Sequence, residues 1–193
     1  MDTRDKRTGG VMNFEDLVKM VFKNSGISIY FKDKFPSSFM LSVMHEGAEG
    51  GYGYPVTGHE FIAVYSLAIN MDSSRPFHVL LHELSHATGH SSRLSRPSLC
   101  PLAYRANITN RAFEEIVAEL SASHLMELLN FTDSSSKKFT KAYLNKWKVD
   151  LMQGSGLNFI PSSFMQDMED AASEASKYIL DNWIDINEIK KAA

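Results

Sequence analysis

Two histidines and a glutamate lie close together near the middle of the chain. They belong to the run His82-Glu83-Leu84-Ser85-His86, which has the pattern H-E-x-x-H. On an α-helix the two histidines are one turn apart and point the same way. Two imidazoles on one face can bind one Zn²⁺, and the glutamate can then hold and deprotonate a water that the metal activates. The run therefore predicts a catalytic metal site.

The residues around this run predict the helix that it needs. Pro76 suits the first turn of a helix, apolar residues follow it, and Gly89 is a natural stop. We therefore expect a helix from Pro76 to about Gly89 with one face for packing and one for chemistry. The packing face carries Leu80, Leu81, Leu84 and Thr88, and the chemical face carries His82, Glu83, His86 and His90. The alternative is a chance grouping on a solvated helix face, which the apolar flank and the following glycine disfavour.

A third metal ligand is expected from a later segment, because catalytic zinc normally takes three protein ligands and leaves a fourth position for water. Glu115 and Glu119 are four residues apart on one face of a helix predicted over Ala112 to Asn130. Carboxylates that are partly buried there need a partner, such as a metal or a metal-bound imidazole. We expect Glu115 to be the ligand and Glu119 to accept a hydrogen bond from a ligand histidine. A solvated acidic patch is the alternative, and Glu114 is expected to be exposed.

His90 is an alternative third ligand, because it shares the predicted chemical face. A metzincin pattern does not fit, since its third histidine would fall on Ser92. A helix that ends near Gly89 would carry His90 away from the metal. Hydrogen bonding or stabilisation of an oxyanion is then the expected role of His90, and also of Tyr104 and Arg93 in the segment that follows. Each of these also fits an ordinary surface residue.

The two motifs together resemble the zincin-type metallopeptidase domain of ArdC antirestriction proteins, with related domains in polyvalent proteins of phages and conjugative plasmids. H-E-x-x-H, a following G-H and R-L-x-R, and a later E-E-x-x-A-E segment recur together in that family. The closing helices, including Ala142-Tyr143-Leu144 and Trp147, add to the likeness. It implies an α+β, zincin-like fold with a small curved, mainly antiparallel sheet packed on the active-site helix and additional C-terminal helices. In zincins the E-x-x-A-D/E pattern also places the metal ligand on its first acid, here Glu115.

This resemblance implies a zinc metallopeptidase, encoded by a phage or mobile element, that hydrolyses peptide bonds of a protein substrate. One Zn²⁺ per chain would be held by His82, His86 and Glu115, with Glu83 as the base. The alternative is a zinc-containing binding module that blocks a host defence or DNA-associated protein without cleaving it. ArdC proteins carry an N-terminal domain that binds single-stranded DNA. Only about 60 residues precede the matching region here, so DNA binding is not carried over.

Composition narrows the class of protein. The chain of 193 residues is 44% hydrophobic and 22% charged, which suits one globular domain over residues 11–193 behind a flexible tail, residues 1–10. A net charge of −3 does not support a broad nucleic-acid surface. Cys100 is the single cysteine, so no internal disulfide can form, and neither a secretory signal nor a membrane span is evident. We therefore expect a cytoplasmic protein, in the bacterial host if a phage or plasmid encodes it.

The remaining elements follow from periodicity and turn residues. His78 and His124 lack ligand spacing, and His124 is expected to pack on the apolar face of its helix. Residues 45–59 are glycine-rich and expected to be irregular, and residues 91–110 are expected to form a long loop. Strands are predicted over 27–31, 39–44 and 61–69, and helices over 14–22, 138–152, 161–180 and 184–190.

Overall fold

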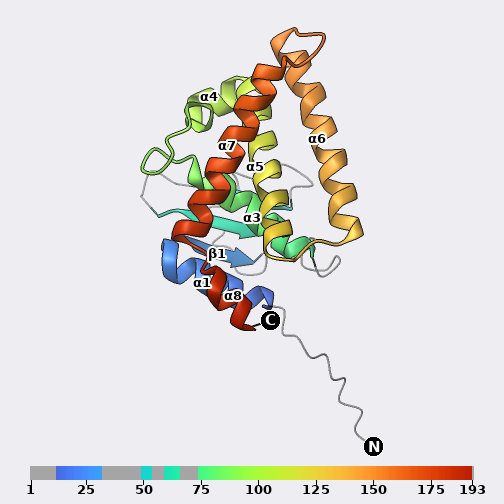
Figure 1. Cartoon of the computed structure of the whole chain (residues 1–193). Coiled ribbons are helices and arrows are strands. Elements are labelled where there is room, and N and C mark those ends of the chain that lie inside the picture. Colours follow the sequence, from blue (N-terminus) through green and yellow to red (C-terminus); the bar gives the residue numbers. More distant parts are fainter. Residues whose placement is uncertain (1–11, 32–48, 54–58, 66–73, 193) are drawn as a thin grey trace, which may run out of the picture.

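The computed structural model describes residues 12–31, 49–53, 59–65 and 74–192. Within these ranges the chain forms a three-stranded sheet and a larger group of helices (Figure 1). The predicted tail over residues 1–10 and the predicted strand over residues 39–44 lie outside the described residues. The α+β fold with additional C-terminal helices is confirmed. None of the described helices is both long enough and apolar enough to cross a membrane.

The sheet is mixed. It contains β1 (Ser28–Phe31), β2 (Gly50–Gly53) and β3 (Phe61–Val64) in the order β1-β3-β2. β3 pairs with β1 in parallel and with β2 in antiparallel orientation, whereas a mainly antiparallel sheet was expected. The prediction of irregular structure over residues 45–59 is wrong for β2. Its glycines disfavour a strand intrinsically, but pairing with β3 and close packing on a helix override that preference.

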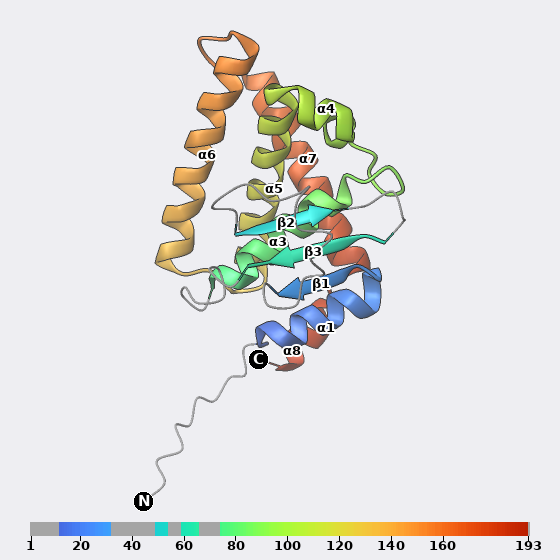
Figure 2. The ribbon, with the colours of Figure 1, turned by 180° about the vertical axis from the view of Figure 1, so that it is seen from behind.

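One helix, α3 (Arg75–Thr88), lies in the centre of the fold and carries the H-E-x-x-H run. The sheet covers one side of α3, and α5 (Ile108–Leu128) packs along another side (Figure 2). Pro76 stands in the first turn and the helix ends before Gly89, as predicted. Every residue of α3 is buried. The expected chemical face therefore exists, but it points into the protein and is not a solvated surface.

The other helices complete the shell around α3 and α5. Helix α1 (Phe14–Ser25) begins at Asn13, whose side chain accepts from the Asp16 N–H, and ends at Gly26 in the left-handed region with φ 71°. After α5 come α6 (Ser134–Ser155), α7 (Ser162–Asn182) and α8 (Ile186–Ala192), as predicted apart from their ends. α5 starts earlier than expected because the Asn107 side chain caps it. The capping box of Asp133 and Ser136 likewise starts α6 early.

The segment over residues 91–110 is not the long loop that was expected. It holds a short 3₁₀ helix (Pro97–Leu99) and α4 (Pro101–Ala106). Both prolines lie in the first turn of their helix, where the missing N–H costs nothing. They therefore start helices here, although the prediction took them as signs of irregular structure.

Three serines join α3, α5 and α7 where these helices meet. The Ser85 hydroxyl donates to Ser121 Oγ at 2.8 Å, and the Ser176 hydroxyl donates to the same oxygen at 3.1 Å. All three side chains are buried. Small side chains let helix backbones approach closely, and here their hydroxyl groups also satisfy one another inside the core.

Gly50 lets β2 approach α3 closely. A Cβ added at Gly50 would lie 2.6 Å from Val79 Cγ1 and 2.9 Å from Glu83 Oε1. Neither neighbour can move freely, because both belong to the buried helix α3. The absence of a side chain at this position therefore brings the backbone of β2 next to the glutamate of the H-E-x-x-H run.

Replacing Gly50 by alanine should lower the free energy of unfolding by about 1–3 kcal/mol, the usual cost of overpacking a core. Chemical denaturation followed by circular dichroism measures this loss. The double variant Gly50→Ala/Val79→Ala removes the nearest clash and should recover part of the stability. Wild-type stability in the single variant would show that β2 does not need this close approach.

Candidate metal centre

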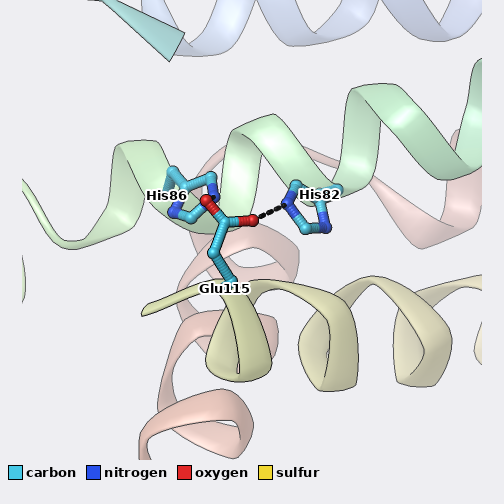
Figure 3. A group of neighbouring side chains, drawn as sticks. All are labelled: His82, His86 and Glu115. Atoms are coloured by element: carbon cyan, nitrogen blue, oxygen red, sulfur yellow. Dashed lines mark ion pairs between the residues drawn. The ribbon is translucent and has the colours of Figure 1, made fainter. Parts of the chain in front are cut away.

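Helices α3 and α5 bring together His82, His86 and Glu115, as Figure 3 shows. Each offers one ligand atom, and these atoms lie within 4.8 Å of one another. His82 Nε2 lies 3.4 Å from Glu115 Oε2, and His86 Nε2 lies 3.8 Å from Glu115 Oε1. All three residues are buried. These are the three residues that the sequence singled out as metal ligands.

The spacing and chemistry of these donors suit a zinc ion. Two ligands at 2.0–2.2 Å from a tetrahedral ion lie about 3.4 Å apart. The two histidine–carboxylate separations are equal to this value or slightly longer, and no two donors are more than 4.8 Å apart, so small side-chain movements would close the donors around an ion. Two imidazoles and one carboxylate form a donor set that zinc takes in catalytic sites, with one position left for water.

Behind His82 lies Glu119, whose carboxylate also contacts a further histidine. Glu119 Oε2 is 3.2 Å from His82 Nδ1, and its Oε1 is 2.9 Å from His78 Nε2. The second contact is close but is not aligned as a hydrogen bond. Glu119 is 1% exposed and His78 2%, so neither polar side chain can turn to solvent. An acceptor on Nδ1 leaves Nε2 of His82 directed at the site.

Behind His86 lies Glu114, which the sequence analysis expected to be exposed. That expectation is wrong, because Glu114 is fully buried. The Arg96 guanidinium holds it through Nε at 2.9 Å and Nη2 at 3.0 Å, and Ser98 donates to it at 2.6 Å. His86 Nδ1 lies 3.9 Å from Glu114 Oε2. The buried arginine stabilises the carboxylate. Arg96 is the last residue of the R-L-x-R pattern, but nothing in that pattern tied it to Glu114.

Arg96 reaches Glu114 only because Gly89 lacks a side chain. A Cβ at Gly89 would lie 2.7 Å from Arg96 Nη2. The same guanidinium donates to the Ser85 carbonyl and to Thr88 Oγ1, both at 2.8 Å. It thereby satisfies the end of α3 as well as the acid on α5.

Glu83 lies against β2, where a Cβ added at Gly50 would be 2.9 Å from its Oε1. It is 7% exposed, and the backbone N–H of Tyr52 donates to its carboxylate. Burial raises the pKa of Glu83, while the neighbouring His82 and His86 oppose that rise. A carboxylate with a raised pKa, next to the two candidate ligand histidines, is a stronger base than an exposed glutamate.

Two tyrosines hold the carboxylate of Glu115. The Tyr104 hydroxyl donates to Oε1 and the Tyr143 hydroxyl donates to Oε2, each at 2.6 Å. Burial and the charge of Glu115 raise the pKa of both phenols, so both remain donors at ordinary pH. Tyr104 was a sequence candidate. Tyr143 was noted only for its resemblance to the family's closing helices, and nothing in its spacing tied it to Glu115.

The charges of the site depend on one another. Burial alone would lower the pKa of both histidines, but hydrogen bonds with acids raise the pKa of His82 to about 10 and that of His86 to about 9. For His82 the acids are Glu115 and Glu119. Burial alone would raise the pKa of Glu115, but His82 and His86 hold it well below the ordinary value. Without a metal the donors are thus protonated imidazoles around an ionised carboxylate.

His90 and Arg93 do not join this group. His90 Nδ1 lies 2.8 Å from Ser92 Oγ and 3.5 Å from Glu60 Oε1. Arg93 donates to the Ala87 carbonyl at 2.8 Å and pairs with Glu60. Both side chains are therefore engaged at the end of α3, away from the three ligand atoms. His124 was expected to pack on an apolar face and is instead exposed.

Comparison with known proteins gives the family. Residues 33–156 match the sequence model of a family described as zincin-like metallopeptidase, MPTase-PolyVal. The chain belongs to this zincin-like metallopeptidase family. The match covers both α3 and α5, so the whole group of His82, His86 and Glu115 lies within the family's domain, and a metal ion is expected there. The resemblance stated from the sequence motifs is thereby confirmed.

Solved structures and curated proteins were also compared. Two structures of the antirestriction ArdC protein from plasmid R388, one metal-free and one with Mn(II), are similar to this zincin-like chain. Each is 22% identical over 96% of this chain, with TM-scores of 0.44 and 0.46. The chain spans about half of their length, 53% and 55%. The search of curated proteins gave no match.

Metal binding should release protons. Because the pKa values of His82 and His86 are about 10 and 9, both are protonated at pH 7 in the metal-free protein and must lose a proton to bind a metal. Affinity should therefore rise with pH up to about 9–10, with two protons released at pH 7. Calorimetry of zinc binding in buffers of different ionisation enthalpy counts these protons.

The same raised pKa values predict the stability of the metal-free protein. The two protonated histidines contribute fully to the free energy of unfolding below pH 6.5, the ordinary histidine pKa. This contribution is lost as the pH rises through about 9 for His86 and about 10 for His82. Denaturation at a series of pH values in a chelator should therefore show falling stability above neutral pH. Zinc binding without proton release, together with flat stability over this range, would contradict both expectations.

Replacing Arg96 by methionine should destabilise the fold by about 3–5 kcal/mol, because it leaves a buried carboxylate at Glu114 without its charge partner. Urea denaturation measures the loss. Lys146→Met removes an exposed ion pair with Asp150 and should cost less than about 1 kcal/mol. Adding Glu114→Gln to the Arg96 variant should recover part of the loss; equal effects of the Arg96 and Lys146 changes would contradict the assignment.

Proposed function

We propose that this chain is a zinc-dependent metallopeptidase that hydrolyses peptide bonds in a protein substrate. The observation that carries the proposal is the convergence of His82, His86 and Glu115, with Glu83 beside them on α3. Zinc, when bound to the first three, would polarise a peptide carbonyl and lower the pKa of a water. Membership of the zincin-like metallopeptidase family supports this proposal.

Glu83 acts as the general base and acid in the proposed reaction. Its carboxylate accepts a proton from the attacking water and later donates that proton to the leaving amine. Burial raises its pKa, which makes the carboxylate a stronger base towards the water than an exposed glutamate. Glu119 and Glu114 do not take part directly. Glu119 contacts Nδ1 of His82 at 3.2 Å, and Glu114 lies 3.9 Å from Nδ1 of His86.

The substrate is proposed to lie along the outer side of β2, which is an edge strand among the three strands that the structure describes. The Tyr65 N–H donates to the Glu49 carbonyl at 2.9 Å. In an antiparallel pair this means that the backbone N–H and C=O groups of every second residue, counted from Glu49, point towards β3. The backbone groups of Tyr52 point away from β3, and its N–H donates to the Glu83 carboxylate. An extended peptide can pair with a strand on that side and so bring a peptide bond next to Glu83. Tyr104, whose hydroxyl lies at the metal ligand Glu115, is the proposed donor to the carbonyl oxygen as charge develops on it.

A variant of Glu83 tests this function. Glu83→Gln should keep one zinc per chain and reduce cleavage of denatured casein by about 10²–10⁴-fold, the range for loss of a general base. Metal analysis and release of acid-soluble peptides are the measurements. Glu127→Gln, at an exposed position of α5, is the matched control and should keep both properties.

The outcomes separate cleavage from metal binding. His82→Ala and Glu115→Ala should each lose the zinc, because each removes one of three ligands. Full cleavage by the Glu83 variant, or loss of its zinc, would contradict the proposed role. A wild-type protein that binds zinc but cleaves no casein, together with a Glu83 variant that keeps its biological effect, would favour the non-cleaving binding module.

A further inference from the structure

Glu115 is held at both of its oxygens by phenols from two different helices. Tyr104 comes from α4 and donates to Oε1, and Tyr143 comes from α6 and donates to Oε2. Both distances are 2.6 Å, short values that are typical of an O–H group bound to a charged carboxylate.

Two such bonds fix the plane of the carboxylate and leave it able to bind a metal. Each oxygen of an ionised carboxylate has two lone pairs, and one phenol on each leaves one lone pair free. The same two oxygens lie 3.4 Å from His82 Nε2 and 3.8 Å from His86 Nε2. The phenols therefore prepare Glu115 for an ion between the two histidines, and they need not leave for the ion to bind.

The two phenols are not equally well supported. The Tyr143 ring contacts His82 edge-on at 5.6 Å, stacks on Phe139 at 5.7 Å and meets Trp147 at 6.2 Å between centroids. It also stands within α6, a helix of 22 residues packed along α5. Aromatic neighbours on α3 and α6 thus restrict the Tyr143 ring in the position where its hydroxyl meets Glu115.

The ring of Tyr104 has fewer aromatic neighbours than that of Tyr143. It stands on α4, a helix of six residues. Its ring meets His86 at 6.5 Å between centroids, and the Arg111 guanidinium lies 5.5 Å from the ring centroid. The ring–ring contact with His86 is longer than the three ring contacts of Tyr143, and α4 packs mainly on α5 and on the short 3₁₀ helix. Tyr104 can therefore leave Glu115 with less disturbance of the fold than Tyr143 can.

We propose a division of roles between these two phenols. Tyr143 is a positioning residue that keeps Glu115 in place as the third metal ligand, and Tyr104 is dispensable for metal binding and turns its hydroxyl to an oxygen of the bound substrate. The phenolic proton stays on Tyr104 throughout, so the change is an exchange of hydrogen-bond acceptors. The second half rests on the proposed function, whereas the first concerns metal binding alone.

Metal affinity tests the first half without any measurement of cleavage. Tyr143→Phe keeps the ring and its packing but removes the hydrogen bond, and it should raise the zinc dissociation constant by about 10–100-fold. The visible absorption of Co²⁺ in the site should shift, because the geometry of Glu115 changes. Tyr104→Phe and the control Tyr178→Phe, a half-buried tyrosine on α7, should stay within about threefold of wild type with unchanged spectra.

Acetohydroxamate, whose oxygens take the place of the reacting oxygens, tests the second half. Its binding to the cobalt-loaded protein should weaken about tenfold in Tyr104→Phe, the loss expected for one hydrogen bond of about 1.4 kcal/mol. Tyr178→Phe should bind it as wild type does. Equal affinity in the Tyr104 variant, or no binding to the wild type, would overturn the role of Tyr104.

The result for Tyr143 stands or falls separately. Wild-type zinc affinity and an unchanged cobalt spectrum in Tyr143→Phe would overturn its positioning role, and equal losses in the two tyrosine variants would overturn the division between them. If wild-type protein binds zinc but cleaves no casein, the proposed function fails, while a tenfold or greater loss of zinc affinity in Tyr143→Phe still supports the positioning role.

Discussion

The fold depends on the compensation of buried charge between α3 and the acids of α5. Glu114, Glu115 and Glu119 are all buried, and each would be costly there without a cationic or hydrogen-bonding partner. α3 supplies the histidines, and Arg96 follows it in the chain. A shift of one helix along the other by a single turn would separate every one of these pairs at once. The electrostatic pairing therefore fixes the same register that sets the spacing of the candidate metal ligands.

A bound metal ion would change the source of the positive charge around Glu115, but not the compensation of its negative charge. Without an ion, two protonated histidines neutralise Glu115, and two phenols occupy its remaining lone pairs. An ion would take over the positive charge that the two protons now provide, so the buried carboxylate stays compensated in both states. Glu114 and Glu119 lie on the Nδ1 sides of the histidines and keep their contacts. The structure is thus suited to accept an ion without rearrangement of its core.

Much of the site could be predicted from the sequence, because its chemistry is periodic. The spacing of His82, His86 and Glu115 in H-E-x-x-H and E-x-x-A-E carries over directly to helix faces, and α3 and α5 place them as expected. Some roles could not be predicted because they come from contacts between helices that are distant in the sequence; these are the roles of Glu114, Tyr143 and His78. A buried arginine decides the burial of Glu114, and no local pattern encodes such a pair. The strand β2 escaped for a similar reason, since its glycines serve the approach to α3 and not the strand itself.

The contact of Ser85, Ser121 and Ser176 has a consequence for mutational tolerance. Ser85 lies between the two histidines of the run. Its hydroxyl donates to Ser121 Oγ on α5, and the Ser176 hydroxyl on α7 donates to the same oxygen. A larger side chain at any of the three positions would press the helices apart, and the displacement would be transmitted along α3 to the ligand atoms. Sensitivity to substitution should therefore extend to Ser176 on α7, a residue that touches none of the ligand side chains. The packing of α7 against α5 and α3 therefore constrains the site, as do the residues that line it.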